Sequence, residues 1–104
     1  MSNYEKIMEF LNNNRSNHVL IGISSNEIST CIDMKNGYEF EINDDDSECI
    51  DVIIEGKHEE FLTLTDINIW NIVEDKDNMV TFYDDTDFEI SNNGMSIGFK
   101  INSK

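Results

Sequence analysis

The segment from Ser2 to Asn14 has the sequence SNYEKIMEFLNNN, and it defines the first element of the fold. Ser2 is followed three residues later by Glu5, which is the spacing of a helix capping box. The apolar residues behind it recur with helical spacing and form one stripe, widened by Phe10: Tyr4, Ile7, Met8 and Leu11. The asparagine run at 12–14 favours turns. We therefore predict a helix from about residue 3 to residue 13.

Downstream of this helix, the pattern is typical of strands. From Tyr38 to Ile42, apolar residues alternate with acids, so the apolar side chains should face the core and the acids should face water. Residues 65–74 fit either a strand or a short helix. The predicted strands are His18–Ser24, Ile28–Met34, Tyr38–Ile42, Cys49–Glu55, Glu60–Thr65, Met79–Tyr83, Phe88–Ser91 and Met95–Ile101.

Short polar turns separate these strands. The pairs Asn36-Gly37 and Asn93-Gly94 are strong hairpin signals. Short connections between successive strands favour an antiparallel meander. The predicted fold class is therefore α+β, with the N-terminal helix packed on a curved antiparallel sheet built from hairpins. At this length we expect residues 1–104 to form a single domain, with strands from about residue 18 to residue 101.

Charge is the strongest functional signal in the chain. Its 104 residues include 22 Asp and Glu against 7 Lys and Arg, a formal net charge of -15. Small soluble domains usually carry a net charge of about 2 to 8 in magnitude. The 15 isoleucines and 14 asparagines are typical of AT-rich coding, which would also enrich lysine, yet there are only 6 lysines. We interpret the acidity as selected; this composition argues against the alternative of a halophilic origin.

The acidity is concentrated in the middle of the chain. Residues 1–38 have a net charge of -1, whereas residues 39–89 hold 18 acids against two lysines, a net charge of -16. Direct binding to nucleic acid or to an anionic membrane is disfavoured, because both need basic side chains. The chain has no apolar run long enough for a membrane span and no signal-peptide pattern at its start. We therefore expect a cytoplasmic protein with a basic partner.

Carboxylates recur at alternate positions in two segments. Asp85, Asp87 and Glu89 are predicted to project from one strand face, about 6.6 to 6.8 Å apart, and Glu39 and Glu41 repeat the spacing. A rigid array of this kind resembles a row of backbone phosphates and could compete for the basic grooves of a nucleic-acid-binding protein. The alternative is an ordinary solvated sheet face, since outward faces are commonly charged.

Two acidic loops add to this predicted partner-binding surface. The first is the tip at 43–48, with Asp44, Asp45, Asp46 and Glu48, and the second contains Asp84. Asp44, Asp46 and Glu48 have the alternating oxygens of a calcium loop, but Cys49 stands where an EF-hand requires glycine. We therefore predict no cofactor and no dedicated metal site, and a weak divalent site remains an alternative. A solvated acidic tip could reach into a basic cleft.

The cysteines, histidines and aromatic residues show no catalytic pattern. Cys31 and Cys49 lie in predicted strands, so we expect buried reduced thiols, with a disulfide between strands as the alternative. They form no zinc pattern with His18 or His58, and no nucleophile signature surrounds either histidine. We therefore predict that the protein is not an enzyme. The aromatic residues are expected in the core, Trp70 and Tyr83 being the likeliest to be partly exposed: Phe61, Trp70, Phe82, Tyr83, Phe88 and Phe99.

In size, acidity, AT-rich composition and helix-then-strands layout, the chain resembles the small acidic inhibitors of phages and mobile elements, especially the anti-CRISPR proteins. The resemblance covers the whole chain, but it rests on composition and layout and not on a motif. Several proteins of that kind occupy the DNA-reading cleft of a Cas nuclease with acidic side chains. The resemblance implies a similar contact surface here, formed by Asp44, Asp45, Asp46, Glu48, Asp84, Asp85, Asp87 and Glu89.

The leading hypothesis is a stoichiometric inhibitor that mimics nucleic acid and blocks the DNA- or RNA-binding cleft of a basic enzyme. The first-choice partners are a CRISPR-Cas effector or a restriction enzyme. An alternative is an immunity protein that neutralises a cognate bacterial toxin nuclease, which composition alone does not distinguish from the first. A further alternative is a small acidic metal-binding regulatory domain. The residues predicted to bind the partner also include Glu39 and Glu41.

Overall fold

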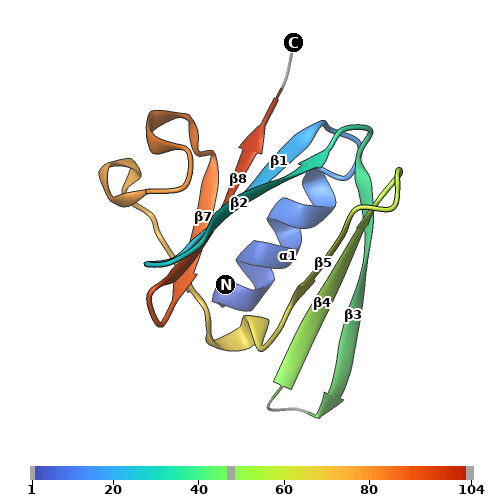
Figure 1. Cartoon of the computed structure of the whole chain (residues 1–104). Helices are drawn as coiled ribbons and strands as arrows, with labels where there is room; N and C mark the ends of the chain where they lie inside the picture. The colour runs from blue at the N-terminus through green and yellow to red at the C-terminus, as the bar shows by residue number, and fades with distance from the viewer. Residues whose placement is uncertain (1, 47–48, 103–104) are drawn as a thin grey trace.

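The computed structural model describes residues 2–46 and 49–102, apart from the side chains of Asp45, Asp46 and Asp84. Within these residues the chain forms one α-helix and eight strands, and every strand pair is antiparallel. The strands form two sheets, and the helix lies between them (Figure 1). The predicted α+β class, with a helix packed on antiparallel sheet, is confirmed. The strands are divided between two sheets, where the sequence suggested one.

Helix α1 (Asn3–Asn13) begins and ends as predicted. The Oγ of Ser2 accepts a hydrogen bond from the amide of Glu5 at 3.2 Å, and the Glu5 carboxylate accepts one from the amide of Ser2 at 2.9 Å. The predicted capping box is therefore present. Ile7 and Leu11 are fully buried, so the apolar stripe anchors the helix to the core.

The larger sheet joins the two ends of the chain. Its strands lie in the order β2-β1-β8-β7-β6. Asn93 and Gly94 have φ angles of 49° and 82° and close the predicted hairpin between β7 and β8. These five strands are β1 (Val19–Ser24), β2 (Ser29–Met34), β6 (Asn71–Ile72), β7 (Phe88–Asn92) and β8 (Met95–Ile101).

The smaller sheet is a local meander of β3 (Tyr38–Asp46), β4 (Cys49–Gly56) and β5 (Phe61–Leu64). The prediction of a loop at 43–48 was wrong for its first part, because β3 continues to Asp46 past an irregularity in the pairing with β4. In Figure 1 the β3–β4 hairpin extends below the rest of the molecule.

The predicted hairpin at Asn36-Gly37 is wrong, because β2 and β3 belong to different sheets. Gly37 carries the chain from one sheet to the other with a φ of 90°. A Cβ atom on Gly37 would lie 2.4 Å from the carbonyl oxygen of Arg15, which accepts a hydrogen bond from the amide of Tyr38. Glycine is therefore needed here for a close approach between distant segments as well as for its backbone angle.

The segment from Val73 to Asp87, which we call the strap, contains no strand, so the prediction of one at Met79–Tyr83 was wrong. It holds two single-turn 3-10 helices, η2 (Lys76–Asn78) and η3 (Tyr83–Asp85). Residues 65–74, for which the sequence allowed either a strand or a short helix, contain one of each. A 3-10 helix η1 (Ile67–Ile69) is followed, after Trp70, by the short strand β6.

The core is one cluster of buried side chains that links α1 to the inner faces of both sheets. Phe99 and Ile21 contribute from the larger sheet, and Val52 and Ile54 contribute from the smaller one. Tyr38, which is 1% exposed, donates a hydrogen bond of 2.7 Å from its hydroxyl to the carbonyl oxygen of Leu11. This bond ties the start of β3 to the last turn of the helix.

Replacing Tyr38 with phenylalanine should lower the free energy of unfolding by about 1 kcal/mol at neutral pH, since the Leu11 carbonyl loses its buried donor. Burial raises the pKa of the Tyr38 hydroxyl, and nearby Arg15 opposes this effect. The folded state therefore holds the phenolic proton more tightly than the unfolded state. This contribution to stability is complete below the ordinary tyrosine pKa of about 10 and is lost as pH rises above it.

The measurement is chemical denaturation of both proteins from about pH 7 to pH 11, across the ordinary tyrosine pKa. The wild type should lose stability at the alkaline end faster than the Tyr38→Phe variant. Tyr83→Phe is the matched control, because its ring is 81% exposed. Equal alkaline slopes for the wild type and Tyr38→Phe would contradict the assignment.

Candidate functional site

The outward face of the smaller sheet combines carboxylates with exposed apolar side chains. Strand alternation directs Tyr38, Ile54 and Leu64 toward the core, so their neighbours along each strand point away from it. Strand pairing sets Glu39 opposite Glu55 and Glu55 opposite Phe61, with Glu41 opposite Ile53 and Ile53 opposite Thr63 in the next row. We call this surface the acidic face; it consists of Glu39, Glu41, Ile53, Glu55, Phe61 and Thr63.

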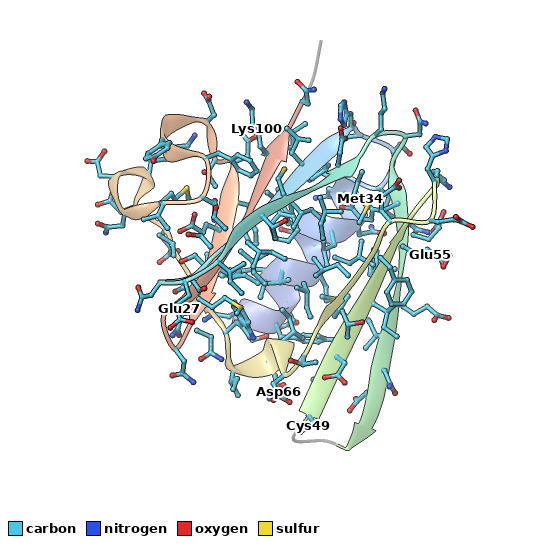
Figure 2. The ribbon with its side chains drawn as sticks, in the orientation of Figure 1. Glu27, Met34, Cys49, Glu55, Asp66 and Lys100 are labelled. Carbon is cyan, nitrogen blue, oxygen red and sulfur yellow. The ribbon has the colours of Figure 1, made fainter. Side chains whose placement is uncertain are left out.

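The acidic face has a shallow hollow at its centre. A space of about 340 Å³ is lined by Glu39, Phe40, Glu41, Ile53, Glu55 and Phe61. The ring of Phe61 is 58% exposed, so the prediction that it lies in the core was wrong. Glu55 lies on the side of the sheet that faces away from the helix (Figure 2). An exposed aromatic ring framed by carboxylates is a combination that suits a cationic partner surface.

Within the described residues, only one of the three carboxylates on this face is paired with cationic side chains. Glu39 is hydrogen-bonded to the guanidinium of Arg15 and lies 3.5 Å from Nζ of Lys57. The hydrogen bond and charge of Arg15, with a smaller contribution from Lys57, lower the pKa of Glu39 below its ordinary value. Among the described residues no cation forms an ion pair with Glu41 or Glu55.

The charge of the smaller sheet exceeds its share of the chain. Residues 38–64 contain ten of the 22 acids and only one lysine, Lys57. Directly opposed like charges destabilise an antiparallel pair, yet Glu39 and Glu55 face each other across β3 and β4. The two cations that hold Glu39 offset this repulsion. A surface that tolerates such a pair is a candidate for binding.

The structure separates the predicted partner-binding residues into two groups. Glu39, Glu41 and Asp44 are exposed on β3. Asp85 and Asp87 are exposed on the strap, which lies at the opposite side of the molecule (Figure 1). The predicted contributions of Glu48 and of the side chains of Asp45, Asp46 and Asp84 lie outside the described residues. The two carboxylate segments therefore do not form one continuous surface.

The predicted row of Asp85, Asp87 and Glu89 on one strand face is also wrong, because β7 begins only at Phe88. Asp85 lies in η3, with its carboxylate 3.7 Å from Nζ of Lys100. The carboxylate of Asp87 accepts a hydrogen bond of 2.7 Å from the amide of Ile101 and fastens the end of the strap to β8. These two acids are therefore engaged by the fold.

Glu89 is a structural carboxylate and is 1% exposed, so its assignment to a partner-binding surface was wrong. Its oxygens accept hydrogen bonds from the amide of Val80 at 3.1 and 3.2 Å and from the amide of Thr81 at 3.0 Å. The hydroxyl of Thr81 donates a further bond of 2.7 Å. A buried charge is tolerated when it is well hydrogen-bonded, and Glu89 meets that condition by holding the strap.

The strap crosses the outer face of the larger sheet where β1 and β8 both carry glycine. Gly98 pairs with Glu89 on one side and with Gly22 on the other. A Cβ atom on Gly98 would lie 1.6 Å from the hydroxyl oxygen of Thr81, and one on Gly22 would lie 3.0 Å from the ring of Phe82. The paired glycines therefore provide the space in which the strap lies.

The two aromatic residues singled out for exposure behave differently. Trp70 is 7% exposed and donates its indole N–H to the carbonyl oxygen of Thr65 at 3.1 Å, so it belongs to the core. Tyr83 is 81% exposed at the start of η3, with a φ of 54°. A positive φ is rare for a bulky residue and is often found at functional positions.

Both cysteines are exposed, so the prediction of buried thiols was wrong, and no disulfide joins Cys31 to Cys49. Cys31 lies on β2, an edge strand of the larger sheet, and Cys49 starts β4 at the lower end of the hairpin (Figure 2). Within residues 2–46 and 49–102, no group of three or more His, Cys, Asp or Glu residues is placed to hold a metal ion. The two ring nitrogens of His18 are hydrogen-bonded to the side chains of Asp33 and Asn102.

Comparison with known proteins gives no relative: no family model matches the chain, and neither a curated protein nor a solved structure is significantly similar to it. The helix of the described part is too short and too polar to cross a membrane. The candidate site therefore rests on the geometry of this chain alone. Sequence reasoning missed Ile53, Glu55 and Phe61 because only the pairing register brings them beside Glu39 and Glu41.

Proposed function

We propose that the protein is a non-catalytic, stoichiometric inhibitor that occupies the nucleic-acid-binding cleft of a basic enzyme inside the bacterial cell. The first-choice targets are a CRISPR-Cas effector and a restriction enzyme. The observation that carries the proposal is the acidic face, where Glu41 and Glu55 lack a counter-ion among the described residues and flank the exposed ring of Phe61.

Three physical features support a basic protein as the partner. The net charge of -15 repels nucleic acid and anionic membranes and attracts cationic clefts. The carboxylates of β3 are mounted on a strand about 6.6 to 6.8 Å apart, so they need little ordering when a partner binds. Phe61 and Ile53 add apolar contact at the centre of the same face, which is the usual composition of an interface core.

The test is a cleavage assay with a panel of purified basic nucleases, including guide-loaded Cas effectors and restriction enzymes. The protein is titrated into each enzyme before labelled DNA is added, and both DNA binding and cleavage are measured at about 50 mM and about 200 mM salt. We expect at least one enzyme to lose DNA binding at stoichiometric inhibitor, and the inhibition to weaken at the higher salt concentration.

Each enzyme is also incubated with polyglutamate at the same total charge as the protein. This is the control for non-specific competition by a polyanion. Inhibition by the protein at concentrations where polyglutamate has no effect supports a shaped surface. If every enzyme in the panel binds and cleaves its DNA normally at low salt with the protein in excess, the proposed function is wrong.

A further inference from the structure

The outer edge of β3 is open. β3 is one of the two edge strands of the smaller sheet, and in the described part of the chain it pairs with β4 alone. An unpaired strand edge presents a row of amide and carbonyl groups that can accept another strand. At nine residues, β3 is the longest strand of the fold. Proteins usually shorten, cover or charge such an edge to prevent pairing with other chains.

The chain covers only the beginning of this edge, and it does so with Arg15. The carbonyl oxygen of Arg15 accepts the amide of Tyr38 at 2.9 Å. Its guanidinium is hydrogen-bonded to Glu39 and lies 5.5 Å from the centre of the Phe40 ring. Glu39 and Phe40 point to opposite faces of the sheet, and β4 fills the other side of β3, so Arg15 must lie along the free edge.

Arg15 therefore illustrates the chemistry that this edge accepts, which is a main-chain carbonyl, a guanidinium on a carboxylate and a cation near an aromatic ring. Past Phe40 the alternation of acidic and apolar side chains continues, but Arg15 does not extend along this part of the edge. Glu41 is exposed on the outward face with no ion pair in the described residues, and Ile42 is 47% exposed on the opposite face.

An added strand would alternate in the same way as β3. Its side chains on the outward face would lie opposite Glu41 and beside Glu39, which favours lysine or arginine. Its side chains on the inward face would cover Ile42, which favours an apolar residue. A second copy of β3 is a poor occupant, because its own glutamates would face Glu39 and Glu41. The edge therefore selects a segment of alternating basic and apolar residues.

We propose that the outer edge of β3 past Arg15, centred on Glu41 and Ile42, binds an extended segment of a partner in which basic and apolar residues alternate, as a fourth strand of the smaller sheet. This inference rests on the proposed function in one respect, that the partner is a basic protein. It adds the mode of recognition, in which main-chain hydrogen bonds supply affinity and alternate side chains supply specificity.

The probe is a short fluorescent peptide that alternates arginine with valine, and binding to the full chain is measured by fluorescence anisotropy. A peptide of the same composition, with its arginines and valines in two blocks, controls for charge. The alternating peptide with a methyl group on each central amide nitrogen removes the main-chain donors. We expect each control peptide to bind about tenfold more weakly, the effect of losing one or two hydrogen bonds or matched contacts.

The matched protein variants are Glu41→Gln and Glu55→Gln, which make the same change at the edge strand and at the central strand. Edge binding predicts a loss of about three- to tenfold for Glu41→Gln and less than twofold for Glu55→Gln. Equal binding of the alternating, block and methylated peptides, or equal losses in the two variants, would overturn strand addition and leave the acidic face and the proposed function standing. Selective binding of the alternating peptide, without inhibition of any nuclease, would support the edge and contradict the proposed function.

Discussion

Glu89→Gln, a conservative change in β7 at the carboxylate that holds the strap, should lower the free energy of unfolding by about 2 to 3 kcal/mol. The Glu89 carboxylate accepts hydrogen bonds from the amides of Val80 and Thr81 and from the Thr81 hydroxyl in a site that is 1% exposed. With its oxygen at the Oε1 position, the glutamine would place its NH2 group against the amide of Val80, which bonds Oε2 at 3.2 Å in the wild type, and its neutral oxygen would be a weaker acceptor for the other donors than a carboxylate. In a domain of this length the change corresponds to a fall in Tm of about 10 °C or more.

Calorimetry measures the fall in Tm, and hydrogen exchange locates it. The amides of Val80 and Thr81 should exchange faster in the variant than in the wild type, while those of β3 and β4 remain protected. Glu74→Gln is the matched control, because the Glu74 side chain is 80% exposed and its ion pair with Nζ of Lys6 is long, at 3.9 Å. Equal stability of Glu89→Gln and Glu74→Gln would show that Glu89 does not hold the strap.

The double reversal Glu41→Lys and Glu55→Lys should reduce affinity for the inhibited nuclease about 100-fold or more, chiefly through a slower association rate at low salt. Both side chains are exposed and without an ion pair in the described residues, so the fold does not depend on their charge. A lysine in place of Glu55 would also lie opposite Glu39 and replace a repulsion with an attraction. Stability should therefore be retained.

The control is the double reversal Glu9→Lys and Glu27→Lys, which changes the net charge by the same amount on α1 and at the turn between β1 and β2. Both positions are exposed. Association rates for the two variants are compared across a salt series by stopped-flow fluorescence. If both variants lose affinity equally, net charge is the determinant of binding and the acidic face is not a defined docking surface.

Elements that depend on neighbouring residues were predictable from the sequence. The capping box of Ser2 and Glu5 and the turn at Asn93-Gly94 each close a hydrogen-bonded unit within a few residues. The Asn36-Gly37 pair has the same local pattern and a different outcome, because Gly37 is required by the close approach of Arg15 from a distant part of the chain. Local signals identify a turn there but not the sheet in which the next strand lies.

The candidate site was only partly predictable, because burial depends on long-range packing. Glu41 and Glu89 both lie within acidic, alternating stretches, yet one is exposed on an uncovered sheet face and the other is enclosed by the strap. Phe61 is exposed because α1 covers only the inner face of the smaller sheet. The strap itself could not be expected from β propensity, since it depends on the space left by Gly22 and Gly98.

The pairing of β1 with β8 also affects how quickly the fold can be reached. This pair joins residues of the first quarter of the chain to residues of its last ten, whereas β3, β4 and β5 follow one another closely in the sequence. Bringing distant segments together costs loop-closure entropy before their contacts form, and this slows folding. Local hairpins form much faster. We therefore expect the sheet that bears the acidic face to assemble before the larger sheet, with the late closure of β1 on β8 limiting the folding rate.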